Sequence, residues 1–200
     1  GVKGTYINGI YDTPRGLLTE REMPNVQDWT LIQAGVYGDP LDFATGSMSD
    51  YRRELNMRDG AMVWGGRWTA PSGASLSVES ERLLSMTHPT VGVIRWTLTA
   101  ETDLDLGLLS GVDGDVNNRW AEHFKEVRCQ HLPEGVYVES DTFDPGFRIA
   151  VATRDCVTAD SAVAVSQLPP DDRRILRHYR LRLRAGESVA LTKWAALREN

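Results

Sequence analysis

The sequence is poor in cysteine and contains neither a long apolar run nor a metal-binding spacing of side chains. Its two cysteines, Cys129 and Cys156, are far apart and form no redox or metal motif. We therefore expect both to be reduced thiols of a cytoplasmic protein. No apolar stretch is long enough to cross a bilayer, which excludes a transmembrane helix.

Negative charges outnumber positive ones, with 28 aspartates and glutamates against 22 lysines and arginines, so the formal net charge of the chain is −6 at neutral pH. An acidic chain is repelled by nucleic-acid phosphates and by anionic membranes, so we expect neither as a partner. The start of the chain is polar and carries no secretion signal. Hydrophobic residues make up 41% and charged residues 25% of the chain, as in ordinary globular domains. We expect one domain over residues 1–200.

Helical periodicity is almost absent, whereas apolar and polar residues often alternate with a period of two. In residues 74–86, for example, Leu76 and Val78 alternate with serine and glutamate, as in a half-buried strand. Similar strands are expected at 90–100, 103–111, 136–139, 147–153, 162–166, 175–184 and 188–197. Turn-forming residues separate them. This pattern predicts an all-β sandwich or barrel, with one short helix candidate at residues 118–126.

No catalytic or cofactor-binding motif stands out. The 28 aspartates and glutamates offer many carboxylates, but no spacing selects the pair that glycoside hydrolysis needs. Asp113 and Asp115 begin a segment similar to a calcium loop, yet Asn118 replaces the central glycine and Phe124 the bidentate glutamate. We interpret this segment as a turn and expect no metal and no cofactor. Histidine pairs at ligand spacing, phosphate loops and serine elbows are also missing.

One basic cluster occupies residues 171–184. Alternation places Arg180, Arg182 and Arg184 on one face of the expected strand and apolar side chains on the other. These arginines could form a docking face for an acidic partner. The interpretation that we favour is a charged outer face that prevents edge-to-edge association of the sheet.

Six tryptophans are many for a chain of this length. Exposed tryptophans on a sandwich could stack on sugar rings, whereas buried ones would fill the core or an inter-domain contact. Trp96 and Trp194 lie in apolar strands, and we expect them in the core. Trp64 and Trp68 flank a Gly-Gly pair in an expected hairpin, which makes them the candidate carbohydrate-binding residues.

Six segments, ordered along nearly the whole chain, match the pattern of a known family. They are GTYINGIYD at 4–12, MPNVQDW at 23–29, YRRELNMRDGAMVW at 51–64, VESERLLSMTHP at 78–89, LLSGVDGDVNN at 108–118 and GESVALTKWAAL at 186–197. Together they resemble the first domain of glycoside hydrolase family 65, the family of maltose, trehalose and kojibiose phosphorylases and related hydrolases. Asn56 stands where the family pattern usually has aspartate.

The resemblance implies an amino-terminal antiparallel β-supersandwich of galactose-mutarotase-like architecture, followed by linker helices and a catalytic (α/α)6 barrel. Because the family's general acid and phosphate site lie in the barrel, the resemblance assigns no catalytic residue here. The chain has no initiator methionine and stops at Asn200, so we expect a fragment of a longer enzyme.

The role implied for this fragment is to support the barrel, the cleft rim or a homodimer. If the parent is a phosphorylase, phosphate is its co-substrate. A carbohydrate-binding module is the alternative.

Overall fold

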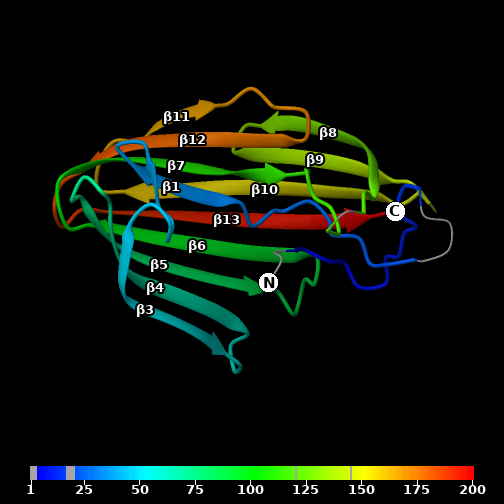
Figure 1. Cartoon of the computed structure of the whole chain (residues 1–200), viewed down its shortest axis with the longest axis horizontal. Helices are drawn as coiled ribbons and strands as arrows, with labels where there is room; N and C mark the ends of the chain where they lie inside the picture. The colour runs from blue at the N-terminus through cyan, green and yellow to red at the C-terminus, as the bar shows by residue number, and fades with distance from the viewer. Residues whose placement is uncertain (1–3, 17–20, 120, 145) are drawn as a thin grey trace.

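The computed structural model describes residues 4–16, 21–119, 121–144 and 146–200 and consists of two antiparallel β-sheets (Figure 1). The strands of the described residues are β1 (Ile32–Val36), β2 (Asp39–Pro40), β3 (Ser47–Asn56), β4 (Ala61–Thr69), β5 (Ser75–Leu84), β6 (Val91–Ala100), β7 (Leu104–Asp113), β8 (Phe124–Leu132), β9 (Gly135–Thr142), β10 (Arg148–Ala159), β11 (Ala164–Gln167), β12 (Arg174–Leu183) and β13 (Ser188–Glu199). No helix occurs among the described residues.

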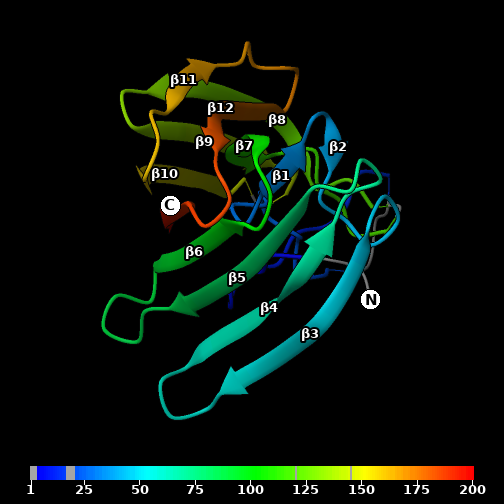
Figure 2. The same ribbon diagram turned by 90° about the vertical axis from the view of Figure 1, so that its left-hand side faces the viewer.

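The two sheets differ in width. The small sheet has the strand order β11-β12-β7-β1-β2, and the large sheet has the order β3-β4-β5-β6-β13-β10-β9-β8. Because the small sheet cannot cover the large one, β3, β4 and β5 extend away from it (Figure 2). We call these three strands the wing.

The core lies between the sheets and follows from the two-residue period of the strands. In β7, Leu104, Leu106 and Leu108 are buried, while the residues between them face outward. The large sheet contributes Leu98 and Leu191 to the same core. Removal of these apolar groups from water is the main favourable term of the fold.

The strands expected from the sequence are confirmed, although several are longer than predicted. The helix expected at residues 118–126 is wrong, because Asn118 forms an isolated bridge with Ala121 and β8 begins at Phe124. Trp120, within that segment, lies outside the described residues. The two cysteines are free thiols, as expected.

The predicted burial of Trp194 is wrong. Val189, Leu191 and Ala195 of β13 face the core, so alternation turns position 193 inward and position 194 outward. Lys193 is consequently fully buried, whereas 39% of the Trp194 surface is exposed.

The buried ammonium group of Lys193 connects the two sheets. Its Nζ donates hydrogen bonds to the carbonyl oxygen of Leu31, at 3.0 Å, and to that of Gly111. Gly111 belongs to β7 of the small sheet, and Leu31 directly precedes β1. A buried charge is tolerated only where polar partners satisfy it, so this contact fixes how β13 lies against β1 and β7.

Asp155 of β10 forms a second polar connection between the sheets. Its carboxylate accepts hydrogen bonds from Ser110 Oγ of β7, at 3.0 Å, and from the hydroxyl of Tyr179 of β12, at 2.9 Å. Burial, together with the charge of Asp155, raises the pKa of Tyr179, so its hydroxyl stays protonated and remains a donor.

Substitution of the buried lysine should destabilise the fold. In Lys193→Met the side-chain volume is similar, but the carbonyl groups of Leu31 and Gly111 lose the ammonium donor, and among the described residues Leu31 keeps only the backbone N–H of Gly111. We therefore expect the free energy of unfolding to fall by about 3 kcal/mol. Urea denaturation followed by tryptophan fluorescence measures this change. The control is Lys125→Met, at an exposed position of β8, which should change stability by less than about 0.5 kcal/mol. Equal stability of the two variants would contradict the connecting role of Lys193.

Candidate functional site

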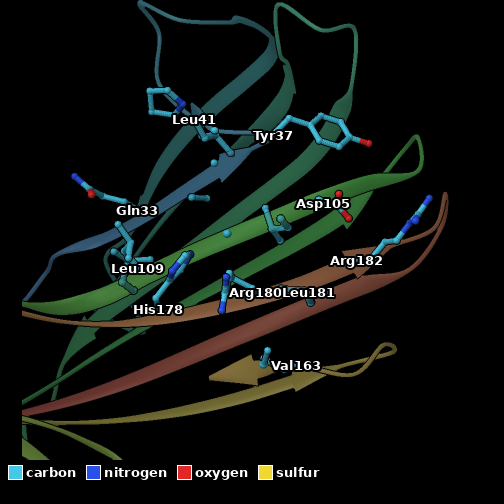
Figure 3. Close-up of a pocket in the computed structure, with 18 of the residues that line it drawn as sticks. Gln33, Tyr37, Leu41, Asp105, Leu109, Val163, His178, Arg180, Leu181 and Arg182 are labelled. Carbon is cyan, nitrogen blue, oxygen red and sulfur yellow. The ribbon is translucent and has the colours of Figure 1, made fainter. Parts of the chain in front are cut away.

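A groove of about 990 Å³ is lined by β1, β7 and β12 of the small sheet and by the turn between β1 and β2 (Figure 3). Buried and exposed residues alternate along these three strands, and the polar side chains that they contribute to the groove lie on the face of the small sheet that points away from the core. Leu181 and the half-buried Trp96 contribute apolar lining from the core side.

Two glycines form the floor of the groove. Gly35 of β1 pairs with Gly107 of β7, and Gly107 pairs in turn with Arg180 of β12. A side chain at Gly107 would begin only 3.1 Å from Nε2 of His178. Glycine in a strand interior often marks a place where another group approaches the backbone closely. At Gly35 a side chain would likewise begin 3.1 Å from the carbonyl oxygen of Asp39, so both glycines allow close packing beside the groove.

One wall is a row of paired residues, Gln33, Leu109 and His178, from three adjacent strands. Burial, followed by the charge of neighbouring Arg180, lowers the pKa of His178. Its imidazole is therefore neutral at neutral pH and offers one hydrogen-bond donor and one acceptor.

Tyr37 forms part of the opposite wall and has an unusual backbone. Tyr37 and Gly38 are the central residues of the β1–β2 turn, with positive φ angles of 51° and 94°. Turns with two left-handed residues favour asparagine, aspartate or glycine, so a tyrosine here carries backbone strain. Its hydroxyl donates to the carbonyl oxygen of Asp103 at 3.1 Å, and 56% of its surface is exposed. The ring is thus held at both ends and open to solvent.

Four further polar side chains around the groove are unengaged. The side chains of Gln33, Asp105, Arg180 and Arg182 form no hydrogen bond or ion pair with any residue that the structure describes. Asp105 pairs in register with Arg182, next to the turn that holds Tyr37 (Figure 3). The groove therefore combines donors and acceptors that are available to a ligand.

The predicted hairpin at Trp64 and Trp68 is wrong. Both tryptophans lie within β4, and the backbone continues straight through Gly65 and its neighbouring glycine. A side chain at Gly65 would meet the carbonyl oxygen of Val78 at 2.8 Å, so close packing against β5, rather than a turn, requires glycine there.

The predicted exposure of Trp68 is also wrong. This residue is fully buried, and its Nε1 donates to the carbonyl oxygen of Asp42 at 3.0 Å. Trp64 is half-buried and packs edge-on against Trp96, with ring centroids 5.5 Å apart. Sugar binding by Trp64 and Trp68 stays a prediction, and of the two only Trp64 has an accessible surface.

The arginine cluster lies partly at the groove. Arg180 and Arg182 point outward, as alternation predicted. The interpretation that these arginines protect a sheet edge is wrong, because β12 lies between β11 and β7 and is not an edge strand.

A second cluster, which sequence reasoning missed, lies at the start of β8. The fully buried His123 contacts Asp12 through Nδ1, at 2.9 Å, and Glu22 through Nε2, at 3.0 Å. The other carboxylate oxygen of Asp12 accepts a hydrogen bond from the backbone of Asp144. These contacts attach the amino-terminal segment to the sandwich. Because the partners are far apart in sequence, no local pattern could reveal them.

The described part of the chain contains no group of three histidine, cysteine or acidic side chains that could hold a metal ion. It also contains no helix long and apolar enough to cross a membrane.

Comparisons with known proteins identify relatives of the whole chain. The model of a family described as "Glycosyl hydrolase family 65, N-terminal domain" matches residues 1–199. Kojibiose phosphorylase of Halothermothrix orenii is 24% identical over 96% of this chain, and alpha,alpha-trehalose phosphorylase of Thermoanaerobacter brockii is 26% identical over 84%. The chain spans about a quarter of the length of both, 25% in each case.

A solved structure named "Putative kojibiose phosphorylase from human microbiome" has the same fold. Its TM-score is 0.86 at 18% identity, and the alignment covers 100% of this chain and 27% of that one. This likeness confirms the predicted antiparallel β-sandwich.

The left-handed turn at Tyr37 and Gly38 allows a test of whether its backbone or the tyrosine ring matters more for stability. Tyr37→Gly removes the ring but relieves the left-handed strain, so we expect the free energy of unfolding to change by less than about 1 kcal/mol. Gly38→Ala puts a side chain where φ is 94°, and it should cost about 1–2 kcal/mol. Chemical denaturation of both variants measures this difference. A larger loss in Tyr37→Gly than in Gly38→Ala would show that the ring, not the backbone, stabilises the turn.

Proposed function

Since this chain belongs to the family of N-terminal domains of glycosyl hydrolase family 65, we propose that it is the non-catalytic domain of a longer, α-glucosidic disaccharide-processing enzyme. Its role in this proposal is to hold the catalytic barrel of the same chain. The observation that carries this role is the uncovered apolar face of the wing. Phosphate is the co-substrate of the parent if the parent is a phosphorylase, and the cytoplasmic location stays a prediction.

The inner face of the wing carries apolar side chains beyond the part that is buried in the core. Leu55 pairs with Met62 and Arg53 pairs with Trp64, so these side chains share the face on which Trp68 is buried. The large exposed apolar residues of this region include Phe43 (67%), Tyr51 (48%), Leu55 (54%) and Leu84 (63%). We call this set, together with Met62 and Trp64, the wing surface.

Contacts within the wing surface hold its side chains in position for a partner. The rings of Phe43 and Tyr51 meet edge-on, with centroids 5.7 Å apart. The guanidinium groups of Arg53 and Arg82 lie 3.5 and 3.2 Å from the sulfur of Met62. An exposed apolar patch with charged groups beside it is typical of a protein–protein contact.

The barrel is the proposed occupant of the wing surface because the relatives are about four times as long as the part that this chain matches. A second copy of the chain, forming a homodimer, is the other occupant that the experiment below distinguishes.

The chemistry of the groove supports a non-catalytic role. Glycoside cleavage with inversion needs a protonated carboxylic acid on one side of the sugar and a nucleophile on the other. The carboxylates that line the groove are Asp42 and Asp105. Hydrogen bonds, chiefly from Thr45, hold the pKa of Asp42 below its usual range, so this group is no general acid.

Carbohydrate binding is a second candidate function. The groove favours it, because an exposed aromatic ring lies beside unengaged polar side chains there.

The wing surface generates a test in the longer enzyme that we expect the gene to encode. Leu55→Asp would bury an unpaired carboxylate against the barrel, so kcat/KM for phosphorolysis or hydrolysis of kojibiose, trehalose or maltose should fall at least about tenfold. Val165→Asp is the control, because Val165 is also exposed, at 52%, but lies in β11 of the small sheet. It should leave activity within about twofold, as surface substitutions usually do.

Three results would contradict the proposal. They are a gene that encodes no further domain, equal activity of the two variants, and cleavage of a disaccharide by residues 1–200 alone at the rate of a relative. A dimer of residues 1–200 that Leu55→Asp dissociates would assign the wing surface to a second copy instead.

A further inference from the structure

We propose that the groove between Tyr37 and His178 is a saccharide-binding site, with Tyr37 as its stacking platform and Arg180, Arg182 and Asp105 as its hydroxyl-binding groups. The inference rests on the proposed function for one point only, the choice of a sugar that a disaccharide-processing enzyme would meet. The position and chemistry of the site come from the small sheet itself.

Tyr37 is the feature that points most directly to a ligand. A pyranose ring has an apolar face of C–H groups, and aromatic side chains with one wet polar end commonly present their rings to such surfaces. The left-handed turn and the hydrogen bond to Asp103 fix this ring before any ligand arrives. A fixed ring loses little conformational freedom on binding. Backbone strain that the fold retains at an exposed aromatic residue is itself a sign of function.

The polar lining matches the hydroxyl groups of a sugar. Each hydroxyl both donates and accepts, and it therefore needs partners of both kinds. Arg180 and Arg182 supply donors, Asp105 supplies acceptors, and Gln33 and neutral His178 supply both. Since these groups, apart from His178, are exposed and have no partner in the described chain, a sugar would not have to displace an existing contact.

The charge balance favours a neutral ligand over an anion. The charged residues that line the groove are Asp42, Asp105, Arg180 and Arg182, two acids and two bases. Their formal charges cancel, and His178 adds none at neutral pH. A phosphate site would instead combine cationic groups without neighbouring carboxylates. The same two arginines are therefore better suited to bind hydroxyl groups beside Asp105 than to bind phosphate.

The shape of the groove also fits. Its volume of about 990 Å³ lies at the upper end of the range for small-ligand pockets, about 300–1,000 Å³. Gly35 and Gly107 both line this groove between the walls that Tyr37 and His178 form.

The test is a titration of the 200-residue chain with kojibiose, trehalose, maltose and inorganic phosphate, followed by calorimetry and by amide NMR shifts. We expect at least one disaccharide to bind with a Kd of about 1 mM and to shift the amides of β1, β7 and β12. Tyr37→Gly and Arg180→Gln should each weaken binding at least about tenfold, whereas phosphate should not bind.

Matched controls separate the groove from general surface effects. Tyr51→Gly removes a similarly exposed tyrosine from the wing, and Arg154→Gln removes an exposed arginine from the large sheet. Both should leave the sugar Kd within about twofold. Far-ultraviolet circular dichroism confirms that each variant folds.

Absence of binding by all three sugars at high millimolar concentration would overturn the inference. So would sugar binding that Tyr37→Gly leaves unchanged, or phosphate binding that Arg180→Gln abolishes, since the groove would then be an anion site. None of these results bears on the wing surface, because the proposed function is tested by Leu55→Asp in the longer enzyme and not by sugar binding to residues 1–200.

Discussion

The two-residue period of β13 is the constraint on which the rest of the structure depends. It places Lys193 between the sheets, where an ammonium group is stable only with polar partners. Those partners include the carbonyl groups of Leu31 and Gly111, which lie just before β1 and near the end of β7. Because β1 and β7 carry Gly35 and Gly107, the same contact sets the position of the groove floor. The packing of the core and the proposed saccharide groove are thus connected through one buried side chain.

The unequal widths of the sheets separate two surfaces with different chemistry. The outer face of the small sheet is polar and glycine-floored, with an aromatic ring held beside it. The inner face of the wing is apolar and open. A sandwich built this way can contact a second domain through its wing and still leave its small sheet free for a ligand.

The strands were predictable because apolar and polar residues alternate within each of them, and the family resemblance turned an all-β prediction into a sandwich. Side-chain positions were less predictable. The expectation that a tryptophan in an apolar strand is buried is wrong at Trp194. Residues 191 and 193 lie on the same face of β13, so Lys193 points inward and Trp194 points outward. The Gly-Gly pair beside Trp64 was read as a turn, although it marks close strand packing. The groove was missed because its residues come from three strands, and only the Tyr37-Gly38 turn left a local signal.

The claim that the wing is a docking surface is tested most directly by amide hydrogen exchange. The measurement compares residues 1–200 alone with the same residues inside the longer enzyme. The account predicts slower exchange in β3 and in the turn that joins it to β4, with unchanged exchange in the distant edge strand β8. Equal exchange of β3 in both proteins would contradict it, because a domain that covers the wing surface restricts the access of water to the amides of β3.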